Sequence, residues 1–144
     1  METPTMGRVL TEAKLENLYD VLGAENGKIP PDEIRHLSVT DALVDTGATM
    51  LSIPTSLIKK LGLNKFSRRR FRSAAGVAEA NLYAAVRLTI QGRFCTMDVM
   101  EVPDDTPVLI GQLPLEQLDF VVDLQSRALI GNPAHGGEQM YELY

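Results

Sequence analysis

The chain has 144 residues, of which 44% are apolar and 23% charged, the usual mix for a globular protein. This length fits one compact domain, so an enzyme with two large lobes is excluded unless two copies of the chain associate. Fourteen Lys and Arg against nineteen Asp and Glu give a net charge of −5, which argues against a general nucleic-acid binder with a basic surface.

The N-terminal half predicts short strands joined by turns that contain glycine or proline. Apolar alternation and turn residues place three strands and then one short helix, at residues 8–18, 36–44, 50–54 and 56–61. Residues 20–33 contain Asn26-Gly27 and Pro30-Pro31 and are expected to form a hairpin turn or a long loop. Gly62 stands at the stop position of the helix.

The C-terminal half predicts mainly hairpins. The expected elements are strands at 71–75 and 80–88 around Gly76, strands at 86–90 and 94–102 around Gln91-Gly92, a strand at 108–111, a helix at 115–118, a hairpin at 120–123 and 128–130, and a last strand at 139–144. Loops are expected at 103–107 and 132–137. Short strands at regular spacing with two brief helices predict a small all-β domain, either a barrel or a sandwich.

Cys95 is the only cysteine, so no intrachain disulfide is expected. It is interpreted as a small buried apolar residue, because a catalytic cysteine would need His36 or His135, both in polar or glycine-rich surroundings. These residues also lack metal-ligand spacing, so neither a metal nor another cofactor is expected. The first twenty residues contain no apolar stretch typical of a signal peptide, and no apolar run is long enough to span a membrane. These features favour a soluble, cytoplasmic protein without a membrane partner.

The segment most informative about function is Leu43-Val44-Asp45-Thr46-Gly47-Ala48. Asp45 directly follows an apolar strand, where a buried carboxylate is costly unless it is hydrogen-bonded or protonated. Gly47 lets the backbone turn tightly enough for nearby N–H groups to point at the carboxylate, and Thr46 adds a hydroxyl. An ordinary strand-to-turn aspartate is the alternative interpretation.

A second apolar segment, Val108-Leu109-Ile110-Gly111, comes later in the chain and precedes the helix expected at 115–118. With these two motifs in this order, residues 36–131 resemble the retroviral-type aspartic proteases, or retropepsins. That family has an apolar-apolar-Asp-Thr-Gly-Ala turn, a mobile β-hairpin flap, and an apolar-apolar-Gly segment before a C-terminal helix.

The resemblance implies a small, closed β-barrel-like acid protease fold in which each chain supplies half of the active site. The chain has one Asp-Thr-Gly and no second Asp-Thr-Gly or Asp-Ser-Gly, so a symmetric homodimer is expected to complete the site. Asp45 and its symmetry mate would share a proton and activate the water that hydrolyses a peptide bond. Thr46 would form hydrogen bonds across the twofold axis, and Gly47 and Ala48 would offer backbone contacts.

The flap is assigned to Ala75, Gly76 and Val77, with Gly76 at the tip, because small residues suit a lid that closes over a substrate. An ordinary hairpin turn is the alternative. Leu109, Ile110 and Gly111 form the second motif. The basic run at residues 68–72 is expected to be a solvated edge before the flap.

The expected organisation is an N-terminal strand and loop at 1–35, a retropepsin-like core at 36–131, and a tail at 132–144, for which the resemblance implies a strand at the dimer interface. The expected partners are a second copy of the chain and a peptide or protein substrate, with no nucleic acid. Two alternatives remain open. The same fold could serve as a non-catalytic dimerisation or peptide-binding module, or the turn motif could be accidental in a β-domain that does not dimerise.

Overall fold

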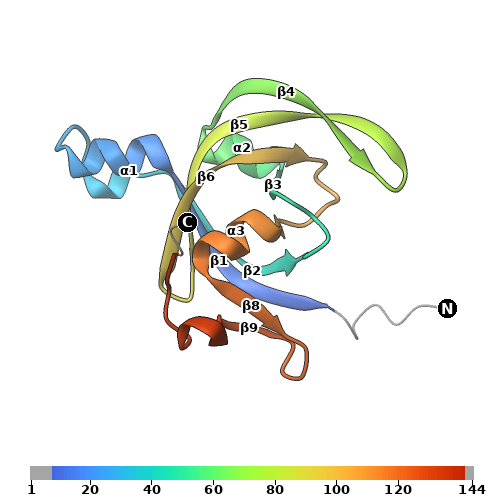
Figure 1. Ribbon diagram of the computed structural model, residues 1–144. Helices are drawn as coiled ribbons and strands as arrows, with labels where there is room; N and C mark the ends of the chain where they lie inside the picture. Colours follow the sequence, from blue (N-terminus) through green and yellow to red (C-terminus); the bar gives the residue numbers. More distant parts are fainter. Residues whose placement is uncertain (1–7, 142–144) are drawn as a thin grey trace.

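β-Strands are the main regular structure of the chain, as its alternating patterns predict (Figure 1). The computed structural model describes residues 8–141. In chain order the elements are β1 (Val9–Asn17), α1 (Leu18–Glu25), β2 (His36–Val44), β3 (Leu51–Pro54), α2 (Thr55–Leu61), β4 (Asn64–Ser73), β5 (Gly76–Ile90), β6 (Arg93–Val102), β7 (Leu109–Ile110), α3 (Gln112–Leu118), β8 (Phe120–Asp123) and β9 (Ala128–Gly131). Three α-helices lie in this part of the chain, where one or two were expected, so the fold is mostly β.

Seven strands form one sheet in the order β1-β2-β7-β3-β6-β5-β4. An additional antiparallel pairing between β1 and β5 makes this sheet ring-like, and β4 lies outside the ring, paired to β5. The pairings of β2 with β7 and of β3 with β6 are parallel, whereas the others are antiparallel. Strands β8 and β9 form a separate two-stranded sheet.

The core is built from alternate strand residues and from the apolar faces of two helices. Leu15 in β1, Leu88 in β5 and Ile110 in β7 are fully buried. Leu61 of α2 and Leu118 of α3 join the same cluster. Full burial of such a side chain contributes about 1.5–3 kcal/mol, so apolar packing holds both helices against the sheet.

The first difference from the sequence predictions is α1. Residues 20–33 were expected as a turn or loop, but residues up to Glu25 belong to this helix. The side chain of Asn17 accepts a hydrogen bond from the backbone N–H of Asp20 at 3.1 Å and caps the helix start. Only Val21 of the helix is buried. Leu18, Val21 and Leu22 do have helical spacing, but the helix is short and turn residues follow it directly. The loop prediction was therefore wrong for residues 20–25.

Strand predictions were accurate where a turn residue bounds the strand. β2 occupies residues 36–44 as predicted. In contrast, β4 and β5 together run from Asn64 to Ile90, well beyond the strands expected around Gly76, with a short turn between them. The basic run at residues 68–72 lies within β4, the edge strand of the sheet, and its arginines are exposed, as expected for a solvated edge before the flap.

The C-terminal part differs in two details. α3 begins at Gln112 rather than at residue 115, and Pro114 is accommodated in its first turn, where a missing N–H leaves no helical bond unmade. Residues 139–141 do not form the predicted last strand, and the remainder of that prediction lies outside the described residues. No helix in residues 8–141 is long and apolar enough to cross a membrane.

Candidate active site

The turn after β2 holds the Asp45 carboxylate against the backbone. The N–H of Asp45 donates to the carbonyl oxygen of Ile110 at 3.0 Å, and the N–H of Ala48 donates to the carbonyl oxygen of Asp45 at 3.0 Å. The N–H of Gly47 donates to Asp45 Oδ1, also at 3.0 Å. The carboxylate is therefore oriented by its own turn, as the Asp-Thr-Gly sequence predicts. Thr46 is exposed beside it.

The second motif lies directly behind this turn. The backbone N–H of Gly111 donates to the carbonyl oxygen of Met50 at 3.1 Å, and that of Gln112 donates to Ala48 at 2.8 Å. Gly111 is buried, and a Cβ at this position would lie 2.5 Å from the Met50 carbonyl oxygen. Only glycine allows so close an approach, so the two motifs form one unit although more than sixty residues separate them.

Strand pairing also reveals a row of side chains on the Asp45 side of the sheet. Leu43 pairs with Leu109, Leu109 with Ser52, and Ser52 with Met100. Because side chains alternate between the faces of a strand, Asp45 falls on the same side as Leu43. Ser52 is buried, and its Oγ has no hydrogen-bond partner in the described residues. Sequence reasoning missed this row, because only the pairing of strands distant in sequence assembles it.

The predicted flap residues lie at the end of a long hairpin that reaches beyond the ring (Figure 1). The β4–β5 pairing continues to Ser73 opposite Gly76, which leaves Ala74 and Ala75 as the turn. Gly76 has φ +120°, a conformation that favours glycine. Ala75, Gly76 and Val77 are all exposed. Their action as a lid stays a prediction.

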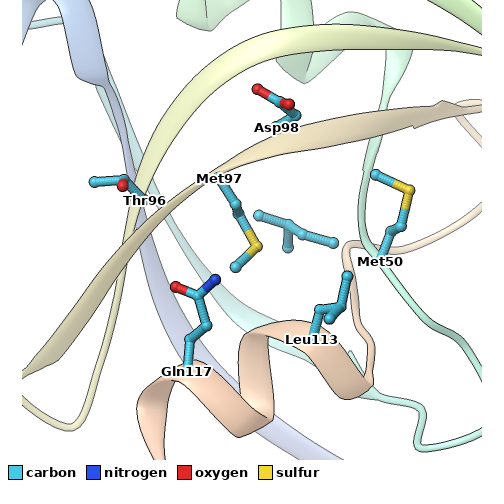
Figure 2. Close-up of a pocket in the computed structure, with 7 residues that line it drawn as sticks. Met50, Thr96, Met97, Asp98, Leu113 and Gln117 are labelled. Carbon is cyan, nitrogen blue, oxygen red and sulfur yellow. The ribbon is translucent and has the colours of Figure 1, made fainter. Parts of the chain in front are cut away.

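A small cavity of about 270 Å³ lies between β6, α3 and the chain that leaves the Asp45 turn. Met50, Met97 and Leu113 supply much of its apolar lining. Figure 2 shows the side chains of Met97 and Gln117 extending toward each other, whereas Asp98 points to the other side of β6. Asp98 also lines the cavity, but its side chain does not point toward Met97 and Leu113, so the space beside these two residues offers mainly apolar contact.

The C-terminal segment is tied to Asp119, at the end of α3. This buried carboxylate accepts hydrogen bonds from Asn132 Nδ2 at 3.2 Å and from the Met140 N–H at 3.0 Å, and it pairs with His135 Nδ1 at 2.7 Å. Burial alone would raise the pKa of Asp119, but these contacts outweigh burial and lower it. No local pattern predicts this cluster, because the partners of Asp119 lie 13 to 21 residues after it in the chain.

The remaining candidates have simple environments. Cys95 is buried, and burial raises the pKa of its thiol to about 11, which agrees with the expected apolar role. His36 is exposed, far along β2 from Asp45. Among residues 8–141, no group of three or more His, Cys, Asp or Glu side chains is arranged to hold a metal ion.

Comparison with known families points to the same part of the chain. A family model described as aspartyl protease matches residues 33–113, which is more than half of the sequence. The match starts just before β2 and ends in the first turn of α3, so it includes the Asp45 turn, the β4–β5 hairpin and the Leu109-Ile110-Gly111 segment. No curated protein matches the chain. By the extent of the family match and the motifs within it, the chain belongs to the aspartyl protease family.

Proposed function

We propose that the protein is a retropepsin-like aspartic endopeptidase with a closed, barrel-like fold, and that it acts as a symmetric homodimer. The observation that carries the proposal is the Asp45 turn, whose carboxylate accepts the Gly47 N–H while Gly111 supports the turn from behind. A plain strand-to-turn aspartate would need no such support from a second, distant segment.

The chemistry requires two carboxylates, and the chain supplies one such turn. Two like charges held close together do not both ionise, so the pair shares a proton. The ionised member takes a proton from the attacking water, and the protonated member donates to the scissile carbonyl oxygen. Asp45 from each of two chains supplies this pair when the turns meet on a twofold axis.

Two features of the single chain support this arrangement. Thr46 and Gly47 are exposed, so they are free to face a second copy of the turn. The β4–β5 hairpin is long enough to reach past the ring and to serve as the lid that excludes water from the bound substrate (Figure 1). In this proposal Leu43 and Leu109 form an apolar wall beside the scissile bond.

The test uses Asp45→Asn with Asp41→Asn as its matched control, since Asp41 is an exposed aspartate on β2, the strand that leads into the Asp45 turn. Cleavage of a peptide library at mildly acidic pH should fall about a thousandfold in D45N and remain unchanged in D41N. Sedimentation should show a dimer for both variants. Undiminished cleavage by D45N, or a strict monomer at concentrations that cleave, would refute the proposal.

A further inference from the structure

The β4–β5 hairpin leaves the body of the protein at one defined point. The pairing of β5 with β6 ends where Leu82 faces Met100, and the pairing of β5 with β1 ends at Val86. Beyond Leu82, residues 76–81 of β5 pair only with β4. This two-stranded segment, residues 67–81, is called the arm below.

One carboxylate connects Asn81, where the arm meets the body, to neighbouring elements. Glu101 follows Met100 in β6, and its Oε1 accepts a hydrogen bond from Asn81 Nδ2 at 2.9 Å. Its Oε2 accepts from Thr55 Oγ1, at the start of α2, at 2.7 Å. Tyr83 OH lies 3.5 Å from Oε1 on the body side of the same junction. The side chain therefore joins three elements at the position where the arm begins.

We propose that Glu101 is a positioning residue that holds the base of the arm against α2 and so controls how the arm closes over a substrate. Its link to catalysis rests on the proposed function, because only a protease uses the arm as a lid. Its link to arm mobility rests on the hydrogen bonds alone. The two consequences are therefore measured separately.

The charge of Glu101 is maintained by its surroundings. Lys59 on α2 and Tyr83 on β5 are the titratable groups that directly affect the pKa of Glu101. Asp104 lies near Lys59. On the arm, Arg68 and Glu79 form an ion pair with each other. Burial alone would raise the pKa of Glu101, but hydrogen bonds from Thr55, Asn81 and Tyr83, together with Lys59, lower it. The hydrogen bonds and Lys59 thus favour the ionised form of the carboxylate.

Amide hydrogen exchange tests arm mobility without any substrate. In Glu101→Ala, amides of residues 67–81 should exchange about tenfold faster, because Asn81 and Thr55 lose a charged acceptor. The matched control is Glu79→Ala, which removes a carboxylate that is bonded within the arm to Arg68, with both side chains about half exposed. Such exposed pairs contribute little, so E79A should change exchange less than twofold.

A conservative variant separates hydrogen bonding from simple packing. In Glu101→Gln the amide oxygen still accepts from Asn81, and the Thr55 hydroxyl can turn to accept from the amide nitrogen. E101Q should therefore restore most of the protection lost in E101A. If E101A does not fold, Asn81→Ala breaks the same link from the arm side. Equal exchange in wild type and E101A (or N81A), or equal loosening in E79A, would overturn the inference.

Kinetics then test the link to catalysis. E101A should lower kcat/KM about tenfold, mainly by raising KM, because a looser arm must be ordered when substrate binds. D41N, whose exposed side chain lies outside the arm, should match wild type. If no variant cleaves but E101A still loosens the arm, the proposed function fails and the positioning role stands. If cleavage depends on Asp45 while E101A cleaves like D41N, only the positioning role fails.

Discussion

Replacing Gly111 with alanine tests the close approach behind the Asp45 turn. The added Cβ would lie 2.5 Å from the Met50 carbonyl oxygen, 2.7 Å from the Thr49 carbonyl carbon and 2.8 Å from the Ala48 carbonyl oxygen. All three are backbone atoms, so the turn itself has to move. Overpacking of this kind costs about 1–3 kcal/mol, and each weakened backbone hydrogen bond at the junction costs about 1 kcal/mol more. We expect G111A to lose about 3 kcal/mol of unfolding free energy.

The assay is urea denaturation followed by far-UV circular dichroism at one fixed protein concentration, because dimerisation would make stability concentration-dependent. The control is Gly23→Ala in α1, where the new Cβ would only touch the Ile29 side chain at 3.6 Å. Alanine favours a helix, so G23A should gain about 0.5–1 kcal/mol. A G111A variant as stable as wild type would refute the account of the turn. So would an equal loss in G23A.

Two further predictions concern titratable groups. Because the pKa of Asp119 is lowered in the folded protein, its contribution to stability is present above the ordinary aspartate pKa and is lost as pH falls through the lowered value. The urea concentration at the unfolding midpoint of the wild type should therefore decrease as the pH falls below about 4, and this decrease should be smaller in Asp119→Asn. Parallel pH profiles for the two proteins would contradict the role of the cluster. Burial raises the pKa of Cys95 to about 11, so iodoacetamide at pH 8 should label it in urea but not in the native protein. Fast native labelling would show that Cys95 is accessible.

The sequence predicts best where a local pattern and a turn residue coincide. β2 has alternating residues and ends at the Asp45-Thr46-Gly47 turn, so its bounds were predicted correctly. α2 was located by Gly62, which takes the left-handed conformation with φ 66°. In both cases the information lies within a few neighbouring residues.

The sequence predicts poorly where the decisive contact is distant. The bond between Asn81 and Glu101 spans 20 residues, and that between Thr55 and Glu101 spans 46. None of these three residues is unusual in its own sequence surroundings, so no motif predicts the hydrogen bonds at the junction. The requirement for glycine at position 111 likewise depends on a distant contact, because a Cβ there would collide with the carbonyl oxygen of Met50.

Strand β3 connects the support of the Asp45 turn with the base of the arm. All four of its residues are buried. Leu51 pairs with Ile110 of β7, which supports the Asp45 turn, and Ile53 pairs with Glu101 of β6. These two positions are two residues apart, or about 7 Å along the strand. The support of the turn and the base of the arm are thus built on opposite edges of one short, buried strand. In the proposed mechanism, this connection would keep the base of the arm at a fixed distance from the Asp45 turn while the arm tip closes.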